Sequence, residues 1–240
     1  MSEVADTPAR LIAAAERLFA EGGEGSTSLR AIARAARANA AAVHYHFGGR
    51  DELLSAVVDR HIGPLTGRRL QLLDEAVARH GEPVPVTALL AAVLRPDLEL
   101  LVRLRRHKVE VARFLGRATT LAVPPGLPYP DRHSEPLPGR LVPLLRASLP
   151  DVGAAELRHR LRLVLACVGV LFANAPDPGE PGPLGTDDVD EQVQRLVAFC
   201  AAGLSAPATQ APPAVATVPP SVAQPESARR AGKRRKKSLT

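Results

Sequence analysis

The sequence predicts an all-α fold, on three observations. Alanine, leucine and arginine dominate the 240 residues, while aromatic residues, which favour strands, make up 3%. Apolar residues recur at intervals of three and four, which places them on one face of a helix. Clusters of glycine and proline divide these periodic segments into separate helices. The 45% apolar content is enough for one sizeable core or two small ones.

The first 50 residues contain three predicted helices. Thr27 or Ser28 can cap the second helix, and Asn39 can cap the third, whose inward side chains would be Val43 and Phe47. Two short helices joined by a three-residue turn, with another helix packed across them, form a helix-turn-helix module. The three predicted helices are residues 8–22, residues 29–36 and residues 40–47.

Longer helices are predicted for the remaining chain, with a proline-rich loop at residues 123–139. We expect a kink at Gly63-Pro64 and a kink or break at Pro96, because proline removes a backbone donor. A basic run at 103–108 either meets an anionic ligand or forms a solvated face. The predicted segments are residues 50–79, 87–119, 140–148, 157–171 and 189–204.

The last two helices carry apolar stripes that suit either the core of the chain or a second copy of it. The first of these helices is also apolar away from its stripe, which favours a surface shared with a partner. We therefore expect a homodimer. The stripes, and the expected interface, consist of Leu157, Leu161, Val164, Val168, Leu171, Val189, Val193, Leu196 and Cys200.

Positive charge is concentrated in the last 35 residues. Residues 206–240 contain seven Lys or Arg and one Glu, which accounts for the whole net charge of +6. This proline-rich, aperiodic segment is expected to be disordered. Because the other 205 residues are neutral overall, binding of nucleic acid by the folded part would depend on local arrangement.

The composition also predicts the compartment and the absence of several kinds of site. Cys167 and Cys200 lie far apart in apolar helical patterns, so neither a disulfide framework nor a metal site is expected. The N-terminus lacks the apolar run of a secretory signal. The 14 uncharged residues between Arg162 and Asp177 are fewer than the ~20 that span a bilayer. We expect a cytoplasmic protein that binds no cofactor and no membrane.

The stretch VHYHFGGRDELL at residues 43–54 invites three interpretations. On a helix, His44 and His46 point about 200° apart, so they do not bind one metal ion from one face. The predicted short helix offers no Ser, Cys or carboxylate for a catalytic pair, and an enzyme is not expected. With Val43 and Phe47 inward, Ala41, Ala42, His44, Tyr45 and His46 remain on the outer side, where they suit phosphates and base edges of DNA.

Residues 28–54, SLRAIARAARANAAAVHYHFGGRDELL, resemble the DNA-binding motif of the tetracycline-repressor (TetR-like) family. The resemblance covers about residues 8–60 and implies an all-helical homodimer with an N-terminal DNA-binding head. It also implies a helical body that binds an effector and dimerises through its last two helices. The implied domains are a helix-turn-helix domain at 1–50, with the module extending to about 60, a ligand-binding and dimerisation domain at 51–205, and the tail at 206–240.

The resemblance implies a set of DNA-contacting residues. Arg30 and His44 would read bases, Tyr45, His46 and Arg50 would hold the backbone, and a position that usually holds Gly is Arg37 here. At Arg37 the chain must adopt a left-handed conformation, at about 1 kcal/mol, or form a different turn. The full set is Thr27, Ser28, Arg30, Asn39, Ala40, Ala41, Ala42, His44, Tyr45, His46 and Arg50.

The function expected from the resemblance is that of a ligand-responsive transcriptional regulator. It would bind a palindromic operator in double-stranded DNA as a homodimer, most simply as a repressor, and respond to an unidentified small-molecule effector. The alternative is an architectural protein of weak sequence specificity, held on DNA by its basic tail.

Overall fold

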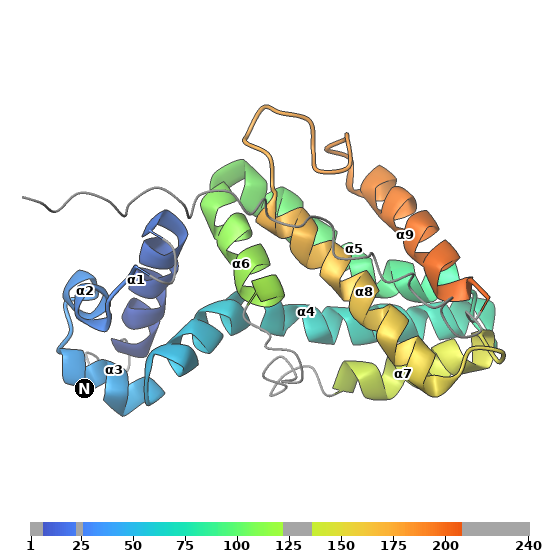
Figure 1. The fold of residues 1–240 in the computed structure, drawn as a ribbon, viewed down its shortest axis with the longest axis horizontal. Helices are drawn as coiled ribbons and strands as arrows, with labels where there is room; N and C mark the ends of the chain where they lie inside the picture. Colours follow the sequence, from blue (N-terminus) through green and yellow to red (C-terminus); the bar gives the residue numbers. More distant parts are fainter. Residues whose placement is uncertain (1–6, 23–25, 122–135, 208–240) are drawn as a thin grey trace, which may run out of the picture. The chain divides into compact units, whose positions relative to one another are not determined.

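The computed structural model describes residues 7–22, 26–121 and 136–207, and Figure 1 shows their arrangement. The chain divides into two compact units, residues 1–208 and 209–240, and every described residue belongs to the first. The described residues form nine helices without a strand, which confirms the predicted fold class. The helices are α1 (Thr7–Gly22), α2 (Leu29–Ala35), α3 (Ala40–Phe47), α4 (Arg50–His80), α5 (Val86–His107), α6 (Val109–Leu121), α7 (Pro136–Ser148), α8 (Ala154–Ala173) and α9 (Val189–Ser205).

The first three helices and the start of α4 pack together as the predicted helix-turn-helix head. Helices as short as α2 and α3 are unstable alone in water, so their buried side chains hold them in place. Fully buried side chains come from each of the four helices, namely Leu11, Phe19, Ile32, Val43 and Leu53.

Side-chain caps begin the short helices where the sequence predicts them. Ser28 Oγ accepts a hydrogen bond from the amide of Ala31 at 3.1 Å, so Ser28 rather than Thr27 caps α2. Asn39 Oδ1 accepts one from the amide of Ala41 at 3.0 Å and caps α3. Each cap satisfies an amide that has no partner within its helix.

The helix predicted at residues 87–119 is two helices, and the break does not occur at the proline. Helix α5 continues through the buried Pro96 and ends before Lys108, whose φ of −151° and ψ of 52° are not helical. Helix α4 likewise continues through Pro64 and changes direction along its length in Figure 1. A proline forfeits one hydrogen bond of its helix, which the burial of neighbouring leucines offsets.

Helix α7 begins within the segment predicted to be a loop. It starts at Pro136 rather than near residue 140, so residues 136–139 are helical. Proline is tolerated in the first turn because its missing N–H would have no partner there. The rest of the expected loop, residues 122–135, lies outside the described residues.

The remaining helices pack closely around α5 and α6. Helix α5 lies against α4 and α9, and α6 lies against α8 (Figure 1). The crossing of α6 and α8 depends on Gly116, where a Cβ atom would lie 2.0 Å from the backbone nitrogen of Ala173. Only a residue without a side chain fits such an approach.

Two residues of the basic run at 103–108 make contacts within the chain, a role that neither interpretation of the sequence included. Arg105 is buried and donates hydrogen bonds to the carbonyls of Pro176 and Asp177, at 3.2 Å each, and to the carboxylate of Asp187. It therefore fixes the connection between α8 and α9. Lys108 binds a carboxylate of α1, as described below.

The absence of a membrane-spanning helix among the described residues, and the position at which these residues end, complete the description of the fold. Along the described ranges, no helix is long and apolar enough to cross a membrane. The expected disordered tail falls outside the described residues from residue 208 onward.

A buried arginine of α8 holds the end of α9. The guanidinium of Arg160 donates to the carbonyls of Leu204 (2.7 Å), Ala206 (2.6 Å) and Pro207 (3.2 Å), which otherwise lack helical partners.

Candidate nucleic-acid interface

The turn between α2 and α3 has the left-handed residue that the sequence suggests. Arg37 has a φ of 52°, in the region that favours glycine. The amide of Ala38 donates to the carbonyl of Ala33 at 2.9 Å, which closes the end of α2. The chain therefore keeps a tight turn at Arg37 and exposes its guanidinium.

Helix α3 turns one side to the core and the other to solvent. Val43 is fully buried, whereas Ala41 and His44 are exposed and Tyr45 is 84% exposed. The His46 ring meets the Tyr45 ring edge-on, with centroids 4.9 Å apart. A phenol combines an apolar ring with a hydrogen-bonding hydroxyl, so this exposed side chain is available to a partner molecule.

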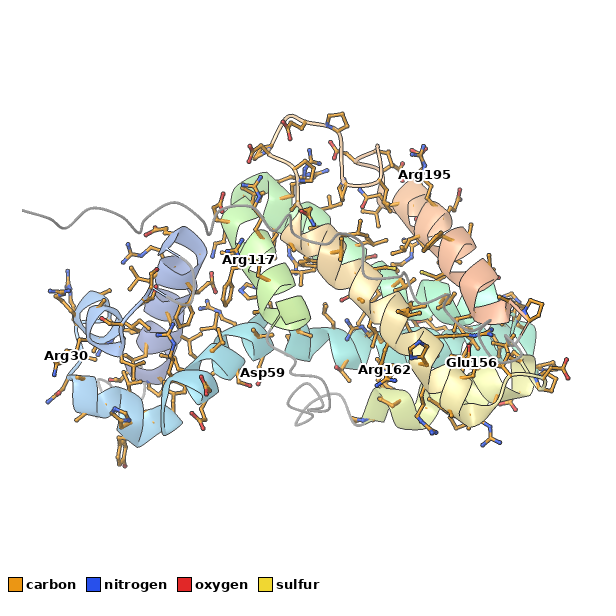
Figure 2. All side chains as sticks on the ribbon, in the orientation of Figure 1. Arg30, Asp59, Arg117, Glu156, Arg162 and Arg195 are labelled. Atoms are coloured by element: carbon orange, nitrogen blue, oxygen red, sulfur yellow. The ribbon has the colours of Figure 1, made fainter. Side chains whose placement is uncertain are left out.

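The sequence on both sides of α3 contains arginines and no acidic residue. Residues 26–50 contain four arginines and neither Asp nor Glu. Arg30 is exposed on α2 (Figure 2), and Arg34, one helical turn later, is exposed on the same face. The sequence interpretation omitted Arg34 and Arg37, although the spacing of four from Arg30 would have indicated Arg34. A locally positive surface of this kind attracts phosphates.

Two residues expected to touch DNA have partners inside the head. The buried Thr27 donates its hydroxyl hydrogen to the carbonyl of Leu18 at 3.1 Å. Arg50 donates to the carbonyl of Thr27, and its guanidinium lies 5.4 Å from the centre of the Phe19 ring. The position of Arg50 at the start of α4 therefore has an internal explanation and does not require a phosphate.

The other expected contact residues divide between the helix caps and the solvent-facing side. The side chains of Ser28 and Asn39 serve as caps, while His44 Nδ1 lies 3.2 Å from the carbonyl of Gly48. Ala40, Ala42 and His46 are partly buried. Arg30, Arg34, Arg37, Ala41, His44 and Tyr45 are exposed, as are the capping residues Ser28 and Asn39.

Five of the nine stripe residues of α8 and α9 are buried within their own chain, which corrects the expectation that these five lie at a dimer interface. The partly buried members of the stripes are Leu161, Val168, Leu171 and Val189. A side chain already buried in its own chain is unavailable to a second copy, whereas the partly buried members stay predictions. The buried members are Leu157, Val164, Val193, Leu196 and Cys200.

The opposite sides of the same two helices remain exposed and apolar. Leu163 and Val170, seven residues apart on α8, are 57% and 49% exposed, and Phe199 on α9 is 69% exposed. With the exposed alanines Ala166, Ala198 and Ala202 they form what we call the outer face. Large exposed apolar side chains on neighbouring helices mark an interaction surface.

The described part of the body offers a hollow but no metal-binding cluster. An open hollow of about 600 Å³ lies where α7 ends and α8 begins, and Val142, Arg146, Leu149 and Val152 are among its lining residues. Among the described residues, no group of three or more His, Cys, Asp or Glu is placed to hold a metal ion.

Two family models match the chain. The model described as "Bacterial regulatory proteins, tetR family" matches residues 11–57. The model described as "Tetracyclin repressor-like, C-terminal domain" matches residues 91–203. Together they cover the head and most of the helices that follow it.

Curated relatives match the chain over part of their length. The chain is 38% identical over 82 residues to the HTH-type transcriptional repressor Rv3405c of Mycobacterium tuberculosis. An HTH-type transcriptional regulator of Mycobacterium bovis, Mb3439c, matches equally well. The match covers 32% of this chain and 43% of each relative, so the chain spans less than half of their length.

Solved structures share the fold at low sequence identity. The ketosteroid transcriptional regulator KstR2 of Mycobacterium tuberculosis superposes with a TM-score of 0.52 at 19% identity, over 82% of this chain and 93% of that one. A TetR-family transcriptional regulator from Bordetella parapertussis gives 0.51 at 18% identity, over 83% and 95%. At such identities the likeness shows the fold alone.

Proposed function

The chain belongs to the TetR family of bacterial regulatory proteins, and from that membership we propose that it regulates transcription by binding a specific DNA operator as a homodimer. The proposed DNA-binding domain is residues 1–50, with the module extending to about residue 60, followed by a body at 51–205 that dimerises and binds an effector. Its family and its curated relatives are regulators of transcription, and Rv3405c is a repressor. We propose repression for this chain as well.

The observation that carries this proposal is the exposed side of α3. Val43 anchors the helix in the core, so Ala41, His44 and the phenol of Tyr45 face outward from a stretch rich in arginine and free of acidic residues. An α-helix fits the major groove, where small side chains permit close approach and imidazole and phenol groups form hydrogen bonds. Because Ala41 offers a methyl group rather than a polar group, thymine contacts and DNA shape contribute to specificity.

Binding sites selected from random double-stranded DNA test the proposal. We expect the full chain to enrich a palindrome with half-sites one or more helical turns apart. Arg30→Ala should relax preference at one base position by about 1–3 kcal/mol, whereas Tyr45→Phe should weaken binding to all sequences alike. Arg103→Ala changes an exposed arginine of α5 and is the matched control. Enrichment of no common sequence by the parent chain would exclude an operator-binding regulator.

The outer face supports the homodimer. It presents Leu163, Val170 and Phe199 on the two helices that end the described chain, and burying such side chains against a second copy removes apolar area from water. Leu163→Asp combined with Phe199→Asp should produce monomers in sedimentation velocity. Ala78→Asp, at an exposed position of α4, should not. A double variant that stays dimeric would place the interface elsewhere.

The effector-binding role of the body follows from the family alone. We propose the hollow between α7 and α8 as a place where an effector could bind. The body also contains a buried ion pair, Arg69 and Asp97, which an effector would leave intact. Arg69 Nη2 lies 2.5 Å from Asp97 Oδ1, and burial raises the pKa of this carboxyl against the opposing effect of Arg69. Removing one partner would leave a buried charge, so the pair is poorly suited to rearrangement.

A further inference from the structure

The break between α5 and α6 places a lysine against the DNA-binding head. Lys108 Nζ, on the body side, lies 3.0 Å from Glu16 Oε1 on α1. The other oxygen of Glu16 accepts a hydrogen bond from His61 Nε2 of α4 at 2.9 Å and lies 3.7 Å from Arg60 Nη1. We call these four residues the Glu16 cluster; in Figure 2, the labelled Asp59 marks the adjoining turn of α4.

Glu16 is buried, which makes its partners important. Its side chain is 6% exposed, whereas that of Lys108 is 55% exposed. A buried carboxylate is costly unless it is paired and hydrogen-bonded. The two oxygens of Glu16 have different partners, one on the helix that leads out of the head and one at the α5–α6 junction, so satisfying the carboxylate fixes three parts of the chain together.

An apolar contact runs beside this cluster from the body to the helix-turn-helix. Phe114 of α6 stacks on Phe19 of α1, with ring centroids 5.7 Å apart and an angle of 22° between the rings. Phe19 also lies under the guanidinium of Arg50, which donates to the carbonyl of Thr27 just before α2. Contacts therefore continue from α6 through α1 to the entrance of the DNA-binding motif.

We propose that Glu16, held by Lys108 and His61, is the positioning site through which the α5–α6 junction sets the orientation of the DNA-binding head. The proposal rests on the proposed function, because orientation of the head determines how the two recognition helices of a dimer meet DNA. Lys108 is a positioning residue that acts through Glu16. Loss of its ammonium leaves one carboxylate oxygen without a partner and allows α1 to move relative to the junction.

Distances between spin labels test this site without any DNA. The labels are placed at Arg34→Cys in the head and Ala78→Cys in α4, both exposed, after Cys167 and Cys200 are changed to Ala. Labelled chains are mixed with excess unlabelled chain so that each dimer carries one labelled copy. Lys108→Met should broaden the distance distribution or add a second population, because the head is less tightly held by the junction.

Two further variants separate positioning from general structure. Lys108→Arg keeps the charge and should restore the parental distribution, and Arg106→Met changes an exposed neighbouring cation and should leave it unaltered. A distribution for Lys108→Met as narrow as that of the parent would overturn the proposal. So would equal broadening by Arg106→Met.

DNA binding provides the link to function. On fragments selected with the parent chain, Lys108→Met should bind at least about fivefold more weakly, since the competent orientation is less populated. Parental affinity in Lys108→Met would overturn the proposal. If the parent selects no fragment, the proposed function fails, while the distance measurement still decides whether Glu16 and Lys108 orient the head.

Discussion

At the scale of residues, local chemistry and distant partners explain different side chains. Ser28, Asn39 and Arg37 act on amides or dihedral angles within three positions of themselves, and the sequence alone predicts the Asn39 cap and the left-handed alternative at Arg37. Arg50 has partners 23 and 31 residues away. Its internal role could not be predicted, because no local pattern specifies which residues tertiary packing brings together.

Glu16 gives a prediction about pH. His61 chiefly, and Lys108 in addition, lower its pKa from the ordinary 4.5 to about 2, against the opposing effect of burial. A carboxyl whose folded pKa is depressed contributes stability above the unfolded value, and that contribution is lost as pH falls from about 4.5 towards 2. Glu16→Gln should therefore lower the free energy of unfolding by roughly 2 kcal/mol at pH 7, after allowance for the solvent-exposed part of the cluster.

Urea unfolding of the parent and Glu16→Gln at pH 7, 5, 4 and 3 measures this effect. The difference between the two proteins should shrink as the pH falls below about 4.5 towards 2, where Glu16 becomes protonated. Glu21→Gln, in an exposed pair with Arg17 on the same helix, is the control and should have a small effect throughout. A difference that is independent of pH would show that the charge of Glu16 is not what stabilises the head.

Arg37 gives a second prediction. Because its φ of 52° suits glycine, Arg37→Gly should raise the free energy of unfolding by about 1 kcal/mol. The neighbouring Ala38→Gly has no positive φ to relieve and should lower it. Denaturant midpoints measure the stability of both variants. If Arg37→Gly is destabilising as well, the arginine side chain contributes more stability than the strained φ removes.

At the scale of elements, apolar spacing predicts helices well, while their ends depend on contacts elsewhere. The sequence predicts a kink or break at Pro96, yet the break occurs at Lys108, whose side chain is held by Glu16 of a helix more than 80 residues earlier. The apolar stripes of α8 and α9 were assigned to a partner, although five of their residues are buried in their own chain. A stripe shows which side of a helix is buried but does not identify what covers it.

The crossing of α6 and α8 is open to a matched test. At Gly116 an added methyl group would meet the backbone of Phe172 and Ala173, so Gly116→Ala should lower the free energy of unfolding by about 3 kcal/mol or prevent folding. A Cβ atom added at Gly67, an exposed position of α4, would have nothing within 4 Å. Gly67→Ala should therefore raise the free energy of unfolding by about 1 kcal/mol through helix propensity. Similar denaturation midpoints for the two variants would contradict the close crossing.

At the scale of the whole molecule, charge separates the two functions that the sequence allows. The basic tail accounts for all of the net charge, whereas the head owes its positive surface to a stretch without acidic residues. An operator-specific regulator requires the exposed side of α3, and an architectural protein requires the tail. The fold and the motif were predictable because they depend on repeated spacing. The exposed apolar face of α8 and α9 was not, since a single sequence does not show which apolar faces remain open after folding.

Truncation after Pro207 distinguishes these functions. This end point preserves the carbonyls that Arg160 binds and removes all seven basic residues of the tail. We expect unchanged base preference and a less steep dependence of affinity on salt, since fewer counterions are released. Electrophoretic mobility shifts across a salt series, on selected and scrambled fragments, measure both properties. Loss of all binding would favour the architectural alternative.

The exposed phenol of Tyr45 gives the proposed DNA surface an intrinsic optical probe. The chain has no Trp and two Tyr, so its ultraviolet fluorescence originates from tyrosine. Tyr45 is 84% exposed on α3, and a phenol that stacks on bases or bonds to phosphate is quenched. Emission can therefore report occupancy of this surface without an attached dye, and Tyr45→Phe identifies the part of the signal that comes from it.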